Sequence, residues 1–343
     1  MRHLAGVFVF ATLMGAASIG LAQQPQITHA QVTAKSADHG LAAELDVLKR
    51  ESAPVWVGYS LPVVERFSNG WDSGRVAYLE GMRSSSDGSE SSTRPSSDHA
   101  NVLMRVAGGD VEKIRVENPD RELDGGGLRF VWLNSVAVDD SLKTLASLVK
   151  QDANKKLRDG GVMAISIHRT PAATQALIAL ASPENDRALR EKAAFWLANE
   201  RGHEGFVAIQ RMGREDKDAA FREKLAFDLT LTKDPDAVKE LVRMAHEDSA
   251  PGVRKQAQFW MAQKGGKIVA GDLNEMAEND PEAQIRKSAV FAISQLPAEE
   301  ATPQLIQLAK TGRDPAVRKQ AVFWLGQSKD PRALDYLTEL IQH

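Results

Sequence analysis

A short residue pattern recurs every 32 residues through the second half of the chain, and this repeat constrains the fold more than any other feature. An arginine marks each copy, and a large apolar residue follows it five positions later. The arginines are Arg158, Arg190, Arg222, Arg254, Arg286 and Arg318, and the apolar residues are Met163, Phe195, Phe227, Phe259, Phe291 and Phe323. Repetition at a fixed period of this length is typical of solenoids, in which each repeat packs on its neighbours.

Each repeat has a second apolar position, which indicates a partner helix in every unit. These positions are Leu145, Leu177, Ile209, Leu241, Leu273, Leu305 and Leu337. Steps such as Asp314–Pro315 and Asp330–Pro331 suit helix starts, because Asp caps free backbone N–H groups and Pro fits the first turn. The pattern predicts stacked helix pairs over residues 123–343, with units near residues 157, 189, 221, 253, 285 and 317.

One helix pair cannot bury its own apolar side chains, so neighbouring units must share a core. The residues that we expect to face this core in the last full unit are Val317, Ala321, Trp324 and Leu325. Phe323 lies about 140° around the helix from the centre of that stripe, which places it on the flank or on the concave side.

The string Asp314-Pro-Ala-Val-Arg-Lys-Gln-Ala-Val-Phe-Trp-Leu-Gly-Gln-Ser-Lys-Asp-Pro-Arg-Ala-Leu-Asp-Tyr-Leu337 resembles HEAT repeats of the short bacterial, phycobilisome-lyase-like kind. This resemblance covers about Asp139–Ile341. The whole chain also resembles a class of secreted bacterial HEAT-repeat proteins that have a Trp-x-Gly-Tyr segment before the solenoid, here Trp56–Tyr59. The resemblance implies an α-solenoid and a role as a scaffold or binding surface, and it implies no particular activity.

The first 22 residues have the pattern of a cleavable secretory signal. Arg2 precedes an uncharged apolar run, and small residues end it at Ala22. Cleavage after Ala22 predicts a periplasmic or secreted protein, if the host is bacterial. The alternative is an uncleaved membrane anchor, since Leu4–Ala22 is nearly long enough to span a bilayer.

The segment between the signal and the repeats has neither the apolar run of the signal nor the 32-residue period of the solenoid. Residues 23–52 are predicted to be a polar lead-in and one short helix, with Leu41, Leu45 and Leu48 on one face. Residues 53–122 are predicted to form a β-rich domain, in which two glycines turn a hairpin within Val102–Val116. Its segment 84–97 has eight serines in fourteen residues, which favours a solvated loop.

Composition excludes several classes of protein. The chain of 343 residues contains no cysteine, which excludes disulfides, thiolate nucleophiles and Cys-ligated zinc. Its formal net charge of −3 argues against a nucleic-acid binder, which normally carries a basic surplus. Its eight histidines include no pair at metal-ligand spacing, so we expect no metal and no cofactor.

The phenylalanine ladder is the strongest candidate binding site. The second helices of a solenoid line its concave face, where partners usually bind, so Phe195, Phe227, Phe259, Phe291 and Phe323 could form a hydrophobic ridge. Packing between adjacent helices is the alternative. The residue after each ladder arginine is acidic in the first three units (Asp159, Glu191 and Glu223) and lysine in the last three (Lys255, Lys287 and Lys319). Such an order would orient a bound chain.

The arginine ladder has a simpler interpretation. An acid precedes the arginine by four residues in several units, and these acids are Asp186, Asp218, Glu282 and Asp314. An anion-binding row is one hypothesis. A structural network of acids and arginines between successive units is favoured, because the two charges neutralise each other.

No enzyme signature is complete. A HEAT-like class of iron-dependent hydroxylases uses His-Glu dipeptides, but His203-Glu204 and His246-Glu247 are 43 residues apart, out of register with the repeat. Ser147–Lys150 and Lys310–Gly312 match parts of a serine-acylase pattern whose middle motif is missing. We therefore expect no catalysis, and a metal-dependent or lyase-type HEAT enzyme is the weakest alternative.

The sequence thus predicts a mainly α protein, an α-solenoid of HEAT-like helix pairs preceded by a small β-rich N-terminal domain. The predicted function is an exported scaffold or adaptor that binds a protein or peptide on the concave face, and its oligomeric state stays open. An alternative places carbohydrate or peptide binding in the β-rich domain, on a platform of Trp56, Tyr59, Trp71 and Tyr78, with the solenoid as a spacer.

Overall fold

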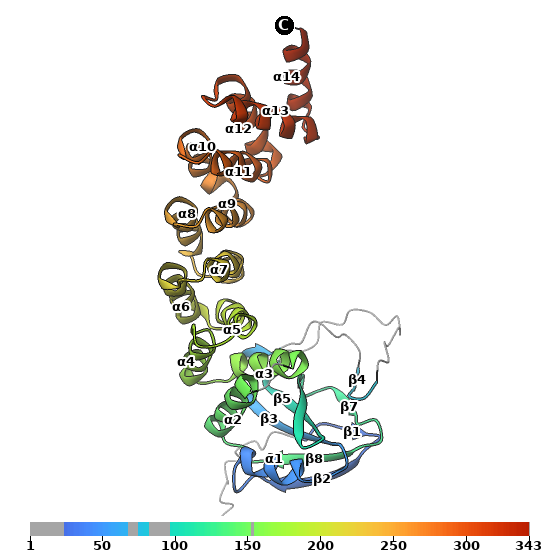
Figure 1. Ribbon diagram of the computed structural model, residues 1–343. Helices are drawn as coiled ribbons and strands as arrows, with labels where there is room; N and C mark the ends of the chain where they lie inside the picture. Colours follow the sequence, from blue (N-terminus) through green and yellow to red (C-terminus); the bar gives the residue numbers. More distant parts are fainter. Residues whose placement is uncertain (1–23, 68–74, 82–96, 152–153, 343) are drawn as a thin grey trace, which may run out of the picture.

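The computed structural model describes residues 24–67, 75–81, 97–151 and 154–342. The predicted signal and residues 84–96 of the serine-rich segment lie outside these ranges. The described chain forms a β-rich module followed by a long stack of helices (Figure 1). It is mainly helical, as the repeat predicted.

The β-rich module is built on a five-stranded mixed sheet with the strand order β2-β8-β3-β5-β6. The strands are β2 (Gln31–Ser36), β8 (Arg129–Asn134), β3 (Val55–Phe67), β5 (Ser97–Ala107) and β6 (Asp110–Glu117). β8 pairs in parallel with both β2 and β3, whereas β5 is antiparallel to β3 and β6. The predicted hairpin is β5–β6, and Gly108 and Gly109 turn it at φ of 60° and 88°.

A second, smaller sheet lies beside the first and has the order β1-β7-β4. Its strands are β1 (Ile27–Thr28), β7 (Glu122–Asp124) and β4 (Val76–Tyr78), all parallel. Side chains alternate along β3, so Trp56 packs with the small sheet while Val57 and Tyr59 pack with the helices. A Cβ on Gly58 would lie 2.9 Å from the side chains of three neighbours, which requires glycine there: Leu103, Phe130 and Trp132.

The boundary between the two parts differs from the prediction. Residues 123–134 were assigned to the solenoid, but Glu122–Asp124 form β7 and Arg129–Asn134 form β8 of the β-rich module. The lead-in of residues 23–52 contains the predicted helix, α1 (Leu41–Lys49), and also β1 and β2. The reason is parallel pairing between distant segments: Val32 is in register with Phe130, and Ala34 with Trp132. The solenoid therefore begins near residue 138.

The solenoid alternates first and second helices along its length (Figure 1). The first helices are α2 (Val138–Gln151), α4 (Pro171–Leu180), α6 (Gly202–Glu215), α8 (Ala237–Glu247), α10 (Ala270–Asn279), α12 (Ala298–Thr311) and α14 (Pro331–Gln342). The second helices are α3 (Lys155–Ile167), α5 (Arg187–Glu200), α7 (Ala219–Leu231), α9 (Pro251–Gly265), α11 (Ala283–Ser294) and α13 (Pro315–Gln327). A short 3₁₀ turn, η1 (Gly266–Val269), precedes α10.

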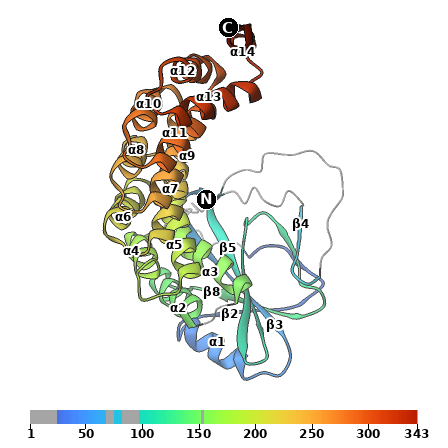
Figure 2. The same ribbon diagram turned by 45° about the horizontal axis from the view of Figure 1, so that its top comes forward.

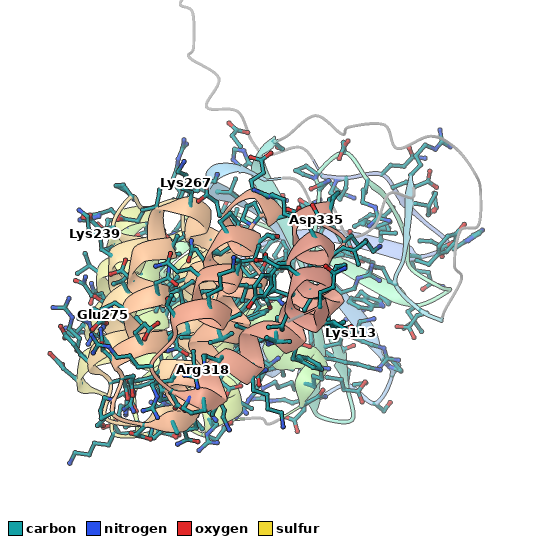
Figure 3. All side chains as sticks on the ribbon, turned by 90° about the horizontal axis from the view of Figure 1, so that it is seen from above. Lys113, Lys239, Lys267, Glu275, Arg318 and Asp335 are labelled. Carbon is teal, nitrogen blue, oxygen red and sulfur yellow. The ribbon has the colours of Figure 1, made fainter. Side chains whose placement is uncertain are left out.

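The stack curves so that α5, α7, α9, α11 and α13 lie on the inside of the bend, facing the same side as the β-rich module (Figure 2). Figure 3 shows the stack from above. Lys239 of α8 and Glu275 of α10 lie on one side, whereas Lys113 of β6 and Asp335 of α14 lie toward the other. The second helices therefore line the concave face, as expected.

The core of the solenoid follows the predicted ladders with two exceptions, Trp324 and the last ladder position, Leu337, which is half-buried. The leucine positions from Leu145 to Leu305 are buried, and so are Val317, Ala321 and Leu325. Trp324 does not belong with them, because it is half-buried at the edge of the core. One continuous cluster of buried side chains extends from the five-stranded sheet to Tyr336 of α14.

Close contacts fix the β-rich module to the first helix pair. A Cβ on Gly160 of α3 would lie 1.9 Å from the carbonyl oxygen of Ile114 in β6, so the helix and the strand are in backbone contact. Behind this contact, the hydroxyl of Ser141 is 2.7 Å from Tyr59 Oη and 2.9 Å from His168 Nε2. All three side chains are buried. No helix within the described ranges is long and apolar enough to cross a membrane.

Candidate binding surface

One ladder phenylalanine lies on each of the second helices from α5 to α13, and these helices line the concave face (Figure 2). Four of the rings are half-buried, and Phe323 is 53% exposed. None is enclosed in the core. Three tryptophans extend the line, each one residue after a phenylalanine. We call these eight residues the aromatic row: Phe195, Trp196, Phe227, Phe259, Trp260, Phe291, Phe323 and Trp324.

The rings of the aromatic row contact one another from unit to unit. Trp260 lies between two phenylalanines, with ring centroids 5.0 Å from Phe227 and 4.8 Å from Phe259. Phe259 then stacks on Phe291 at 5.9 Å with an interplanar angle of 8°. Trp324 lies 5.1 Å from Phe291 and 5.0 Å from Phe323. These are the separations at which aromatic pairs attract each other, so the six rings from Phe227 to Trp324 form a connected surface.

Between Phe195 and Phe227 the aromatic row is bridged by a charged side chain, Lys224, instead of a tryptophan. Asp228 occupies the helix position at which three other units have tryptophan: Trp196, Trp260 and Trp324. Its carboxylate pairs with Lys224 at 2.6 Å, and the Lys224 amine lies 5.9 Å from the centroid of Phe195 and 4.3 Å from that of Phe227. A cation over two rings therefore joins them where the tryptophan is missing. Burial raises the pKa of Asp228 to about 6, despite its ion pair with Lys224.

A pocket of about 770 Å³ lies at the start of the aromatic row, between the solenoid and the β-rich module. Its walls come from β6, α3, α5 and α7. Phe195, Trp196 and Met163 supply apolar wall, and charged side chains surround them: Arg115, Glu117, Asp159, Glu191, Lys192 and Lys224. The pocket is thus concave, partly aromatic and continuous with the ring surface.

The charged residues that follow the ladder arginines lie beside the apolar ladder, as predicted; they are Asp159, Glu191, Glu223, Lys255, Lys287 and Lys319. Five of these residues precede a ladder phenylalanine by four positions, and Asp159 precedes Met163 by the same interval, so each lies on the same side of its helix as that apolar residue. Lys287 and Lys319 are exposed, and Lys255 is half-buried; Glu191 and Glu223 are half-buried as well. Asp159 is exposed and pairs with Lys192.

The first four arginines of the ladder are buried, whereas Arg286 and Arg318 are half-buried. The arginines from Arg158 to Arg286 link successive units. Arg158 pairs with Asp186 at 2.8 Å, Arg222 with Asp248 at 2.8 Å, and Arg286 with Asp314 at 2.6 Å. Arg190 contacts Asp216 and Asp218, and Arg254 contacts Glu282. Arg318 donates to the carbonyl oxygens of Gly312 and Arg313. The hydrogen bond from Arg158 lowers the pKa of Asp186. These contacts occupy the guanidinium groups within the protein.

The aromatic platform expected on the β-rich module does not form. Trp56 and Tyr59 are 0% and 1% exposed, and they lie on opposite faces of the sheet because they are three residues apart in one strand. Trp56 donates to Glu80 at 2.9 Å. Tyr78 is half-buried, and Trp71 lies outside the described residues.

The candidate enzyme motifs stay apart. His203 pairs with Asp234 at 2.7 Å, and His246 lies 3.7 Å from Asp272 and Glu275 on the next first helix. Within the described part of the chain, no three His, Cys, Asp or Glu side chains gather as a metal site would require. The buried Ser141–His168 pair was not singled out in the sequence. Its imidazole is also 2.6 Å from the carbonyl oxygen of Ala164, and burial lowers its pKa to about 4.

Sequence reasoning missed two parts of this surface. The tryptophans were not linked to the phenylalanines, although Phe-Trp recurs at 195, 259 and 323. The contribution of β6 to the pocket was also missed, because it depends on how α3 docks. The paired glycines Gly160 and Gly161 were a usable signal, since such a pair inside a helix often marks close backbone approach.

Comparison with known families identifies the repeat. The family model for HEAT repeats matches residues 272–343, and the chain therefore contains HEAT repeats in its C-terminal part. This confirms the predicted repeat type. None of the curated protein sequences matches the chain.

Three solved structures show similar helical repeats. One is the complex of CpcE and CpcF of phycocyanin lyase from Nostoc, at 22% identity over 46% of this chain and 100% of that chain, with a TM-score of 0.34. Human deoxyhypusine hydroxylase is 15% identical over 58% of this chain and 77% of its own, with a TM-score of 0.32. Escherichia coli YibA is 23% identical over 56% and 70%, with a TM-score of 0.34.

Proposed function

We propose that this protein is a non-catalytic scaffold that binds a protein or peptide partner along the aromatic row. The observation that supports the proposal is the connected line of half-buried rings on the concave face. Contiguous exposed apolar surface is rare on soluble proteins unless it is a binding site. Aromatic side chains also provide much of the binding energy in interfaces, because each buries a large rigid area.

The other polar groups that could have formed a site are enclosed or already bound within the protein, which supports the same proposal. The ladder arginines are occupied by acids and carbonyl oxygens inside the stack. The Ser141 and His168 side chains form a buried pair and are 1% and 0% exposed. A substrate could therefore not approach the serine. We also propose, from residues 1–22 alone, that the partner is met outside the cytoplasm.

A peptide-display selection tests this function because it requires no identified partner. Random peptides are selected on the wild-type protein and measured on Phe323→Lys, whose ring is exposed enough for the variant to fold. We expect the selected peptides to lose at least about tenfold in affinity, because a charge then interrupts the ring surface. Ile268→Lys is the matched control, since Ile268 is 81% exposed on η1, outside the aromatic row.

Circular dichroism first establishes that both variants keep the helicity of the wild type. Peptides that bind the wild type and Phe323→Lys equally well would show that the aromatic row is packing surface only. A second selection on Phe259→Ala, compared with the wild type, then repeats the test at the centre of the row.

A further inference from the structure

The charges beside the aromatic row change sign along its length. In each second helix the residue four positions before the phenylalanine lies on the same side as the ring. This residue is Glu191 in α5 and Glu223 in α7, but it is Lys255, Lys287 and Lys319 in α9, α11 and α13. The end of the concave face near the β-rich module is therefore acidic, and the far end is basic.

These five side chains have no ion-pair partner among the described residues, unlike most of the charges around them. Lys192 pairs with Asp159, and Lys224 pairs with Asp228. The ladder arginines are bound inside the stack. Glu191, Glu223 and the three lysines thus determine the net charge that a ligand meets along the row. The opposite flank of the last three rings carries neutral amides from Gln263, Gln295 and Gln327.

The pocket at the acidic end has the features that a cationic side chain requires. Phe195 and Trp196 meet edge to face at 5.2 Å, which presents ring surface to the pocket, and Glu191 lies on its wall. Arg115 is paired with Glu117 at 2.6 Å, so the charge left unpaired among the described lining residues is the carboxylate of Glu191. A long side chain with an apolar stem and a positive end satisfies both the rings and the carboxylate.

We propose that the partner segment is bipolar. A lysine or arginine enters the pocket beside Glu191, apolar side chains lie on the rings, and carboxylates pair with Lys255, Lys287 and Lys319. This inference rests on the proposed function and adds the chemistry and the direction of the ligand. Four helix-to-helix steps of about 8–10 Å separate α5 from α13. An extended segment of about 10 to 12 residues spans that length.

Two synthetic fluorescent peptides of about this length test the charge order. One carries its basic residues at one end and its acidic residues at the other, and the second has the same composition with the charges interleaved. We expect the bipolar peptide to bind the wild-type protein about tenfold more tightly in low salt, because opposite charges then meet along the whole row. Fluorescence anisotropy gives both affinities.

Charge-reversal variants locate the effect. The double variant Lys287→Glu/Lys319→Glu removes the preference for the bipolar peptide, and so does Glu191→Lys. Lys239→Glu is the matched control, because Lys239 is exposed on the opposite side of the stack (Figure 3). A photo-crosslinker beside the basic end of the peptide should label α5 or α3, and not α13.

Several results would overturn the inference. Equal affinities for the two peptides, crosslinks to α13, or no binding of either peptide would each do so. If the two peptides bind the wild type equally and both fail to bind Phe323→Lys, the aromatic row is the binding surface but the ligand is not bipolar. Loss of peptide discrimination in Lys239→Glu would show that the preference comes from overall charge.

Discussion

Asp228 shows how one residue departs from the repeat and carries a measurable consequence. It replaces the tryptophan of three other units, its side chain is 0% exposed, and its Oδ2 atom has no hydrogen-bond partner among the described residues. Burial raises its pKa to about 6, although Lys224 is 2.6 Å away. Desolvation thus outweighs the ion pair, as it often does for buried charges.

This shift predicts how stability changes with pH. A carboxyl whose pKa is raised on folding contributes stability that is complete below its unfolded pKa and is lost as the pH rises through about 6. Two pKa units correspond to about 3 kcal/mol. We expect Asp228→Asn to gain stability relative to the wild type between pH 4 and pH 7, as measured by urea unfolding. Asp236→Asn, at an exposed surface pair, should show no such gain.

His168 predicts the opposite dependence on pH. Its folded pKa of about 4 lies below the ordinary value of 6.5, so the unfolded chain takes up a proton first as the pH falls. The wild type should therefore lose roughly 3 kcal/mol between pH 6.5 and pH 4 through this group. We expect His168→Gln to be less stable at pH 7 by about 1–3 kcal/mol, because buried partners lose a hydrogen bond. Its stability should also vary less across that range, and an unchanged pH dependence would contradict the assignment.

At the scale of elements, the contact between α3 and β6 gives the clearest prediction. A methyl group on Gly160 would collide with the carbonyl oxygen of Ile114, whereas a methyl group on Gly326 of α13 would meet nothing within 4 Å. Gly160→Ala should destabilise the protein by about 1–3 kcal/mol because α3 must move away from the strand. Gly326→Ala should stabilise it by about 0.5–1 kcal/mol, since alanine favours helices. Thermal unfolding of the two variants provides the comparison.

The elements that the sequence predicted are those whose signals are local. Helix starts at Asp314 and Asp330 follow from Asp–Pro steps, and each aspartate accepts a hydrogen bond from the backbone two residues on. The β1–β7 and β2–β8 pairs could not be predicted in this way, because they join segments 96 and 98 residues apart, as Ile27 with Leu123 and Gln31 with Arg129 show. The aromatic and branched run Phe130–Leu133 was the one local signal for β8.

The same distinction applies to the candidate site. The phenylalanine ladder and the change of charge beside it are periodic, so their sequence positions predict a common face. Contact between Phe227 and Trp260, and the pocket bounded by β6, depend on the curvature of the stack and on the docking of α3. Those features belong to tertiary structure, which the repeat alone does not determine.

At the scale of the whole molecule, the continuous core predicts a gradient of stability. The first helix pair is fixed to the sheet by Gly160 and by the Tyr59–Ser141–His168 contacts. In α14, Leu334 is 67% exposed and Ile341 is 85% exposed. In native-state hydrogen exchange, amides of α2 and α3 should therefore be protected like those of the sheet, while α14 exchanges fastest among the helices. Uniform protection along the stack would contradict this prediction.

The aromatic row also gives the solenoid an uneven stiffness. Its rings already touch from unit to unit on the inner side of the bend, with Phe259 flat against Phe291. Bending the stack more tightly would press these rings into one another, and atoms in contact resist compression steeply. Straightening it only separates them. The solenoid should therefore resist further bending more strongly than straightening. Its concave face can widen around a bulky partner more easily than it can narrow around a thin one.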